Sequence, residues 1–309
     1  MTNLEIISAR SDLYRSIRNY FERSNLLEVE VPLLAKAGTT DPQIESFRVV
    51  GQSSRSYLQT SPEFFLKRLL AETHQSCFCI TKAFRDEEQG KDHNPEFAML
   101  EWYRVEFDLD DIIEDCLELI QLCLSRPELV YRETYTSLFQ KHLDIDPHNI
   151  ELTALAPLVE QHTSYEGSCD SVSEALQLLL CTVIEPTFTG LTLIRDFPAD
   201  QAALARLGKD QSGQLVAQRF EIYFGDIELA NGYHELVDEA EQRSRFERDN
   251  QMRGRLGRSE MLLDEALLDA MKVGLPNCSG VSIGLDRLLM AGLGLRQIDE
   301  VLLFPWNQI

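Results

Sequence analysis

Long apolar runs are missing from this sequence of 309 residues. A helix that spans a bilayer needs about 18 or more consecutive apolar residues, whereas the strongest apolar segment covers only residues 175–181 and is typical of a core helix. The N-terminus also lacks a basic stretch followed by an apolar one, so we expect no secretory signal peptide. These absences exclude an integral membrane protein and favour a cytoplasmic chain with no membrane partner.

Paired cysteine motifs are missing as well. The seven cysteines are scattered along the chain, and none forms a Cys-x-x-Cys pair. A zinc site or a disulfide framework is therefore not expected. Reduced thiols inside a cytoplasmic protein are the favoured interpretation.

Basic residues are scarce. Lys and Arg number 29 against 51 Asp and Glu, which gives a formal net charge of −22. Such a balance is unfavourable for a protein that grips a long phosphate backbone, although it does not exclude a local basic patch. The hydrophobic content of 44% and the charged content of 26% are those of an ordinary globular protein, and the length suits one large or two modest domains.

The most informative segment runs from residue 77 to residue 104. Residues 77–84 and 96–104 are rich in strand-forming residues, and the charged loop between them carries the pair Asn94-Pro95, which excludes a helix there. Strand alternation gives the second strand one face with Phe97, Met99, Glu101 and Tyr103 and another with Glu96, Ala98, Leu100 and Trp102. The first face is more typical of a ligand surface than of a plain core. The alternative is an amphipathic hairpin with solvated charges.

Apolar periodicity and start signals predict the remaining elements. Helices are expected at residues 3–24, 62–71, 108–125, 152–162, 171–183, 236–255 and 261–272. Strands are expected at residues 26–33, 191–194, 219–224 and 227–231, with a two-residue turn at Gly225-Asp226 between the last two. Residues 131–186 carry no recognisable chemistry and are interpreted as a helical insertion beside the sheet.

The segment 280–290 alternates small residues along a strand, and a helix begins where the strand ends. Glycines there let a nucleotide lie against the backbone, and the start of a helix favours anions. The segment therefore predicts a nucleotide-binding end of the sheet.

Three segments carry a family resemblance. Phe84-Arg85-x-Glu87, a loop and then His93-Asn94-Pro95-Glu96-Phe97-x-Met99-x-Glu101-x-Tyr103 resemble motif 2 of the class II aminoacyl-tRNA synthetases, lysyl-tRNA synthetase in particular. The first helix and strand up to Val31-Pro32 are similar to motif 1, and residues 280–290 are similar to motif 3, with Ser282 in place of the usual glycine. Together with the segment 228–235, these motifs follow the family's order over essentially residues 3–305. Over the whole chain the resemblance is closer to truncated paralogues of lysyl-tRNA synthetase, the ligases that attach (R)-β-lysine to elongation factor P.

The resemblance implies an α+β fold, the class II aminoacyl-tRNA synthetase catalytic fold, in which an antiparallel sheet is flanked by helices. It also implies a single catalytic domain over residues 1–309, with a helical insertion at about 131–186, and a homodimer formed through the motif 1 region. Lysyl-tRNA synthetases carry an additional N-terminal domain that reads the anticodon. Only one helix precedes motif 1 here, so we expect that domain to be absent.

The implied activity is attack of an amino-acid carboxylate on the α-phosphorus of ATP, with Mg²⁺ on the phosphates. This chemistry needs fixed cations rather than a protein nucleophile. The catalytic residues would be Arg85 at the α-phosphate and the carboxylate, Arg287 by the adenine and the γ-phosphate, and Glu228 and Glu235 as holders of Mg²⁺. Phe97 would stack on the adenine, and Asp86 stands where the family usually has Asn, which adds a negative charge near ATP. The expected ATP-binding residues are Arg85, Asp86, Glu87, Asn94, Phe97, Glu228, Leu229, Gly284 and Arg287.

A lysine-like substrate brings an ammonium group, which a buried site must answer with carboxylates. For any single glutamate the alternative is a solvated surface residue, and for Ser61-Pro62 the alternative is a helix start signal. Ser282 fills space that a glycine would leave, and we expect it to disfavour α-lysine relative to β-lysine. The residues expected to bind the amino acid are Ser61, Pro62, Glu63, Glu101, Tyr103, Asn231, Glu235 and Ser282.

The predicted function is ATP-dependent activation of (R)-β-lysine or lysine and its transfer to a lysine side chain of elongation factor P, without stable tRNA binding. Two alternatives stay open: a free-standing synthetase that acts on tRNA or a small amine, and a catalytically inactive paralogue with a regulatory role. Arginines in the charged helix predicted at residues 236–255 and in the loop after it could form a local dock for the acceptor, although a solvated helix face is the favoured interpretation: Arg243, Arg245, Arg248, Arg253, Arg255 and Arg258.

Overall fold

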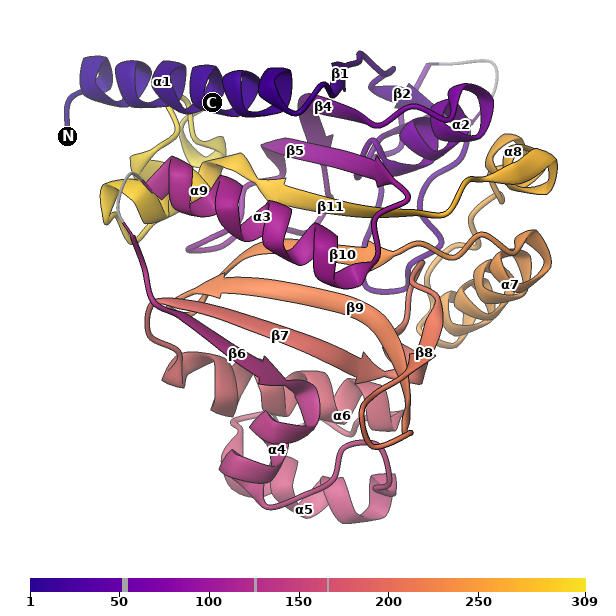
Figure 1. Ribbon diagram of the computed structural model, residues 1–309. Helices are drawn as coiled ribbons and strands as arrows, with labels where there is room; N and C mark the ends of the chain where they lie inside the picture. Colours follow the sequence, from indigo (N-terminus) through magenta and orange to yellow (C-terminus); the bar gives the residue numbers. More distant parts are fainter. Residues whose placement is uncertain (52–54, 125–126, 166) are drawn as a thin grey trace. The chain divides into compact units, whose positions relative to one another are not determined.

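The two ends of the chain belong to the same structural unit. In this computed structural model, which describes residues 1–51, 55–124, 127–165 and 167–309, unit 1 combines Met1–Pro127 with Glu235–Ile309 and unit 2 is Glu128–His234. Each unit contains both strands and helices (Figure 1). The single catalytic domain expected over residues 1–309 stays a prediction.

The strands of unit 1 lie in the order β1 (Leu27–Glu28), β4 (Cys77–Phe84), β5 (Glu96–Val105) and β11 (Cys278–Gly284). β4, β5 and β11 are antiparallel to their neighbours, whereas β1 pairs in parallel with the start of β4. The strands predicted at residues 77–84 and 96–104 are therefore confirmed.

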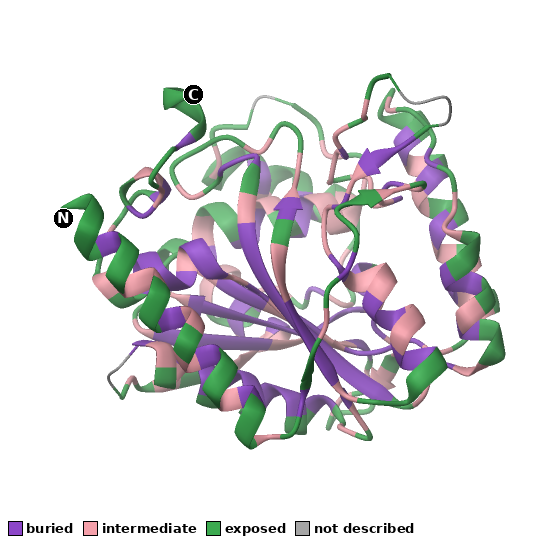
Figure 2. Cartoon of the chain, turned by 90° about the horizontal axis from the view of Figure 1, so that it is seen from above, coloured by how far each residue is buried: buried purple, intermediate pink, exposed green. Residues whose placement is uncertain are grey.

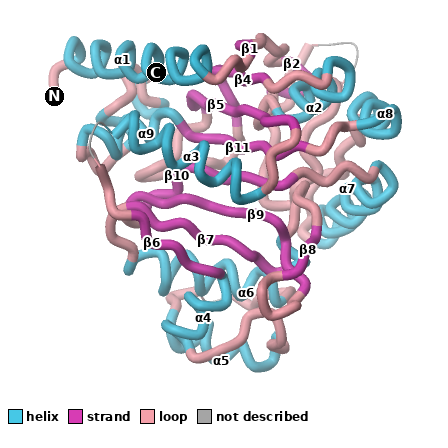
Figure 3. The backbone as a smooth tube through the Cα atoms, viewed as in Figure 1, coloured by secondary structure: helices cyan, strands magenta, loops and turns pink. Residues whose placement is uncertain are grey.

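The segment between the first two helices differs from its prediction. The strand expected at residues 26–33 is reduced to β1, although Val29 N still donates to Phe78 O at 2.9 Å. Two further short strands, β2 (Leu34–Ala35) and β3 (Tyr57–Leu58), pair with each other, and Tyr57 also bridges to Arg48. Most of the described chain around them is loop (Figure 3).

Helices α1 (Asn3–Arg23), α3 (Leu109–Leu124) and α9 (Leu285–Leu293) pack together and contact the strands of unit 1 (Figure 1). Each helix has both buried and exposed residues, whereas β5 and β11 are buried along most of their length (Figure 2). In α1 the packed stripe is Ile6, Leu13, Ile17 and Phe21, whereas the apolar residues Leu4 and Ile7 are exposed. The expected end of the second of these helices, at residues 125 and 126, lies outside the described residues.

Aromatic rings join α1 to the strands. The ring of Phe21 in α1 stacks on Phe78 of β4, with centroids 4.5 Å apart, and its centroid lies 5.4 Å from that of Trp102 in β5. All three side chains are almost fully buried. Trp102 belongs to the face of β5 that points away from Glu101, so this face is the packed one.

A buried carboxylate fixes α3 against this face. Asp115 accepts hydrogen bonds from Trp102 Nε1 at 2.9 Å, from Tyr20 Oη at 2.6 Å, and from the guanidinium of Arg104 at 2.7 and 2.8 Å. A buried charge is tolerated only when it is paired and hydrogen-bonded in this way. The network therefore joins α1, α3 and β5.

Helices α2 (Glu63–Thr73), α7 (Glu239–Arg255) and α8 (Glu265–Gly274) form a second group in unit 1. The last two begin later than predicted, because the side chains of Asp238 and Asp264 accept backbone hydrogen bonds at their N-termini and so set the first helical residue. The apolar residues before each cap, 236–237 and 261–263, were wrongly assigned to the helices.

Unit 2 has its own strand order. Strand β9 is antiparallel to β10, β7 and β8, and β6 is parallel to β7. The strands are β6 (Val130–Thr134), β7 (Leu191–Pro198), β8 (Leu207–Lys209), β9 (Leu215–Phe224) and β10 (Ile227–His234). The hairpin predicted at residues 219–231 is confirmed, with Gly225 at a φ of 58° in its turn.

The region interpreted as a helical insertion lies within unit 2. It contains α4 (Tyr135–Leu143), α5 (Leu152–His162) and α6 (Val172–Leu179), which Figure 1 shows on one side of β6, β7 and β9. Its first residues, 131–134, were assigned to this helical region but belong to strand β6. The helix predicted up to residue 183 is α-helical only to Leu179 and continues as a π helix (Leu180–Ile184) and a 3-10 turn (Glu185–Thr187) that contains Pro186.

The two units confirm the α+β class, with mainly antiparallel strands flanked by helices. Within the described parts of the chain, no helix is both long and apolar enough to cross a membrane. All seven cysteines are free thiols.

We predict that Asp115→Ala lowers the free energy of unfolding by about 3–5 kcal/mol, because it leaves the buried guanidinium of Arg104 without its partner. The matched control is Asp12→Ala, which removes the exposed ion pair between Asp12 and Arg15 on α1 and should cost less than about 1 kcal/mol. Urea denaturation measures both. Equal losses in the two variants would contradict a structural role for the buried network.

Candidate functional site

The face of β5 opposite the packed one is lined by small residues on both sides. Register places Cys79 of β4 and Ser282 of β11 directly opposite Glu101, and it places Gly280 opposite Tyr103. A Cβ at Gly280 would overlap the ring of Tyr103 and lie 2.8 Å from Glu235 Oε1. The small neighbours thus leave room for the long side chains of β5 and bring Glu235 beside them.

Glu101 is the centre of a buried polar cluster. Its Oε1 accepts a hydrogen bond from Tyr103 Oη at 2.8 Å, and its Oε2 accepts one from Ser61 Oγ at 2.5 Å. Ser61 Oγ also accepts the backbone N–H of Glu63 at 3.1 Å. The predicted amino-acid residues Ser61, Glu63, Glu101 and Tyr103 are thus brought together, although their role in binding stays a prediction.

The same cluster contains an ammonium group that we did not predict. Lys67 Nζ lies 2.6 Å from Glu63 Oε1 and 2.6 Å from Glu235 Oε2, and the side chains of Lys67 and Glu235 are only 1% exposed. Burial alone would lower the pKa of Lys67, but the charges of Glu235 and Glu63 outweigh it and raise the pKa. The spacing of Glu63 and Lys67 by four residues in a helix was the available signal.

The cluster also shifts the protonation of its acids. Burial, reinforced by the charge of Glu63, raises the pKa of Glu101 to about 8, although Ser61, Tyr103 and Lys67 act in the opposite direction. Burial raises the pKa of Tyr103 as well. The carboxyl of Glu101 is therefore mostly protonated at neutral pH in the ligand-free protein and can ionise when a cation approaches.

A cationic end lies at the loop between β4 and β5 and at the start of α9. The guanidinium of Arg85 stands over the ring of Phe97, 5.2 Å from its centroid, and Arg85 Nε donates to Thr60 O at 3.4 Å. Arg287 donates to Asp92 O at 3.1 Å and lies 2.6 Å from His93 Nε2. Burial and the nearby charge of Arg287 lower the pKa of His93, which favours the neutral imidazole.

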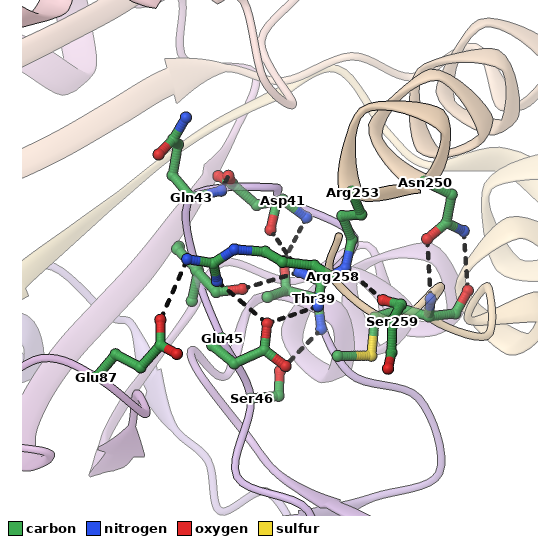
Figure 4. Close-up of polar contacts among 12 residues, drawn as sticks. Thr39, Asp41, Gln43, Glu45, Ser46, Glu87, Asn250, Arg253, Arg258 and Ser259 are labelled. Atoms are coloured by element: carbon green, nitrogen blue, oxygen red, sulfur yellow. Dashed lines mark hydrogen bonds and ion pairs between the residues drawn. The ribbon is translucent and has the colours of Figure 1, made fainter. Parts of the chain in front are cut away.

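The charged loop is tied to other parts of unit 1. Asp86 N donates to Glu45 O at 2.8 Å, and the carboxylate of Glu45 lies 2.6 Å from Arg253 and 3.2 Å from Arg258 (Figure 4). Arg258 also lies 3.1 Å from Glu87, whose φ of 67° is left-handed. Glu87, a predicted ATP contact, is therefore ion-paired within the protein.

The dock predicted for the acceptor is wrong for Arg253. That side chain is fully buried and donates to the carbonyl oxygens of Asp41, Ile44 and Ser259 at 2.8–3.1 Å (Figure 4). A buried guanidinium can donate several hydrogen bonds at once in this way, because its donors are fixed in one plane. Arg243 is likewise paired, with Glu239 and Glu265, although at the surface.

Several predicted residues have different surroundings. Asn94 Nδ2 donates to Glu96 O at 2.7 Å and Asn94 Oδ1 accepts from Trp306 N at 3.1 Å, so this side chain orders the loop. Pro62 forms the N-cap of α2, and Gly284 the N-cap of α9. Their contacts with ligands stay predictions.

Three predicted residues belong to unit 2 and are described within it. Glu228, Leu229 and Asn231 lie on β10, where a register shift falls between Glu228 and Ala230. Leu229 is buried, whereas Glu228 and Asn231 are half-buried. Their roles at ATP and the amino acid stay predictions.

The expected magnesium pair fits this arrangement only in part. Glu235 already has the ammonium of Lys67 2.6 Å from its carboxylate, inside unit 1, where a divalent cation would meet a like charge. No group of three or more His, Cys, Asp or Glu residues in the described parts of the chain is arranged to hold a metal ion. Glu235 is therefore better explained as the partner of an amine.

Comparison with known proteins agrees with this geometry. The family of tRNA synthetases class II (D, K and N) matches residues 2–308. The chain is 41% identical to "Elongation factor P--(R)-beta-lysine ligase" of Mannheimia succiniciproducens, over 98% of this chain and 96% of that protein. Proteins of the same name from Vibrio cholerae and Salmonella gallinarum are 41% and 40% identical, over 97% and 96% of this chain and 95% and 93% of theirs.

The raised pKa of Glu101 predicts that the ligand-free protein loses stability as the pH rises. An unfolded glutamate has a pKa of about 4.3, so above it only the folded state keeps the proton. The stability that this proton gives is complete below the unfolded pKa and is lost as the pH rises through about 8.

Melting temperatures measured between about pH 4 and pH 9 test this, because the window spans the unfolded and folded pKa values. Glu101→Gln should flatten the decrease seen in the wild type, whereas Glu96→Gln, on the exposed carboxylate of the same strand, should leave it unchanged. A decrease that persists in full in Glu101→Gln would refute the assignment.

Proposed function

This chain belongs to the class II (D, K and N) tRNA synthetase family, and from that premise we propose that it is an ATP-dependent ligase that activates (R)-β-lysine, or lysine, and transfers it to a lysine side chain of elongation factor P. The first step joins a carboxylate oxygen of the amino acid to the α-phosphorus of ATP and releases pyrophosphate. In the second step, the amine of the acceptor lysine attacks the activated carbonyl, an amide forms, and AMP leaves.

One observation supports this proposal most directly. A single face of β5 carries Phe97, with Arg85 over its ring, towards one end and the buried pair Glu101 and Tyr103 towards the other. An amino acid that lies along this face would place its carboxylate towards Arg85 and its amines among carboxylates. That orientation suits attack on a phosphate held at the cationic end.

The arginines provide the electrostatic part of the catalysis. Negative charge develops on the phosphate oxygens during the transfer, and fixed cations stabilise it without any covalent step on the protein. We propose Arg85 for the α-phosphate and the carboxylate, and Arg287 for the distal phosphates and the adenine. Phe97 offers the ring face not covered by Arg85 to the adenine.

The carboxylates select the amino acid. When an ammonium group binds beside Glu101, the neighbouring positive charge favours the ionised carboxylate, so this residue releases its proton on binding. Ser282 lies opposite Glu101 on β11 and on the same face. The amines of a β-amino acid and an α-amino acid differ in position. The hydroxymethyl group of Ser282 would therefore favour one of them over the other.

The remaining parts of the proposal concern cofactor, assembly and location. Mg²⁺ would arrive on the phosphates of ATP and neutralise part of their charge, with Glu228 as the protein carboxylate that we propose for it. We propose a homodimer through the motif 1 region around α1 and β1. The acceptor, a translation factor, places the reaction in the cytoplasm.

The relatives' name supports elongation factor P as the acceptor, and the charge of this chain argues against tRNA. Affinity for tRNA depends on many phosphate contacts, whereas this chain carries a net charge of −22. A protein acceptor has to place only one amine over the activated carbonyl. The alternative of a tRNA-charging synthetase therefore lacks electrostatic support.

We predict that Arg85→Ala abolishes amino-acid-dependent ATP–pyrophosphate exchange and leaves the fold intact. Loss of one fixed cation at a developing anion costs about 3–4 kcal/mol, or a factor of about 10²–10³ in rate. The matched control is Arg15→Ala, on an exposed arginine of α1, which should retain full activity. A folded Arg85→Ala protein with near-normal exchange would remove the assignment, and a wild type without exchange for any amino acid would favour an inactive paralogue.

We further predict that elongation factor P is acylated at physiological salt, while tRNA-Lys is neither charged nor able to compete. The assay offers radiolabelled (R)-β-lysine with ATP and either acceptor, alone and together, at low and physiological salt. Inhibition by tRNA at low salt that disappears at physiological salt is expected of weak phosphate contacts. Efficient charging of tRNA-Lys at physiological salt would refute the proposed acceptor.

A further inference from the structure

The buried amino-acid cluster contains more acid than base. Glu63, Glu101 and Glu235 supply three carboxyl groups, and Lys67 is the cation that contacts two of them. Glu101 belongs to the same electrostatic group, because the charges of Glu63 and Lys67 both act on it. Among these four described side chains of unit 1, acid therefore remains in excess after their ion pairs are counted.

Lys67 also joins three segments of unit 1. It lies on α2 one turn after Glu63, and its ammonium reaches Glu235, whose backbone N–H donates to Cys278 O on β11 at 3.0 Å. Without Lys67, the carboxylates of Glu63 and Glu235 would be two like charges on either side of the buried space that its ammonium group fills. Such a pair either takes up a proton or moves apart.

We infer that Lys67 is a positioning residue that determines which amino acids the pocket accepts: by holding Glu63 and Glu235 and neutralising one negative charge, it leaves a pocket matched to a monocarboxylic acid with two ammonium groups. This inference rests on the proposed function, because it concerns the amino-acid pocket of that reaction. No substrate contact by Lys67 itself is required.

The charge count gives the selectivity. Three carboxylates less one internal ammonium leave two negative charges when Glu101 is ionised, and a diamino acid supplies two ammonium groups while its carboxylate faces Arg85. A mono-amino acid of the same length supplies one ammonium group. It therefore leaves one buried carboxylate without a counter-charge, or Glu101 stays protonated. Unanswered buried polar groups are the strongest basis for rejecting an analogue.

The test compares the binding of (R)-β-lysine with that of (R)-3-aminohexanoic acid, which has the same chain but no terminal amine. Calorimetry measures both dissociation constants without catalysis, so the result can be read even if the ligase activity fails. The wild type should prefer the diamino acid by at least about a hundredfold. In Lys67→Met this preference should fall by about tenfold or more.

A charge-balanced variant separates selection from simple support of the fold. Glu63→Gln combined with Lys67→Met removes one negative and one positive charge, and so it restores the excess of two carboxylates. Its preference for the diamino acid should return to within about threefold of the wild type. If Lys67 only supported the fold, the second substitution would lower the preference further. This variant also avoids the unpaired buried carboxylates that could prevent Lys67→Met from folding.

Lys82→Met is the matched control, because Lys82 on β4 is 45% exposed and pairs with Glu96 at the surface. It should change neither dissociation constant. A wild type that does not distinguish the two acids would overturn the inference, as would an undiminished preference in Lys67→Met or a double variant no better than the single one. Absence of pyrophosphate exchange with normal binding selectivity would refute the proposed activity and leave the role of Lys67 in selection standing.

Discussion

Strict alternation along β5 is the constraint on which the rest of unit 1 depends. Trp102 and its neighbours on one face must pack under α1, α3 and α9, where Phe21 and Asp115 hold them. The same alternation then obliges Phe97, Glu101 and Tyr103 to share the opposite face. A shift of one residue would bury the acidic cluster under the helices and expose the tryptophan. The packing of one face therefore fixes the chemistry of the other.

How far the sequence predicts this structure depends on whether a feature is local. Strand alternation gave the composition of both faces, and the motifs gave the set Ser61, Glu63, Glu101 and Tyr103 that the fold brings together. The starts of α7 and α8 were misplaced because one capping aspartate, rather than the apolar residues before it, sets the first helical residue. Residues 131–134 were misassigned because a short strand beside helices has little periodicity of its own.

The buried ion pairs could not be read from the sequence, because burial is decided by distant segments. Lys67 sits four residues after Glu63, which is the spacing of an ordinary surface pair on a helix. Its enclosure depends on Glu235, which lies far along the chain. Arg253 likewise sits in a highly charged helix and looks exposed, yet it bonds the 41–45 segment in the interior. In both cases the identity of the partner, and not the local pattern, determines the role.

Two kinds of ion pair in unit 1 suit the two ends of the proposed reaction. At the nucleotide end, Arg85 with Glu88 and Arg258 with Glu87 are partly exposed, at 3.5 and 3.1 Å. Such pairs contribute about 1 kcal/mol or less, so a triphosphate can replace a carboxylate as the partner at little cost. At the amino-acid end, Lys67 with Glu235 is enclosed, and separating it would leave buried charges unpaired. The cations near the proposed ATP site can therefore exchange partners, whereas the charges of the proposed amino-acid site stay fixed.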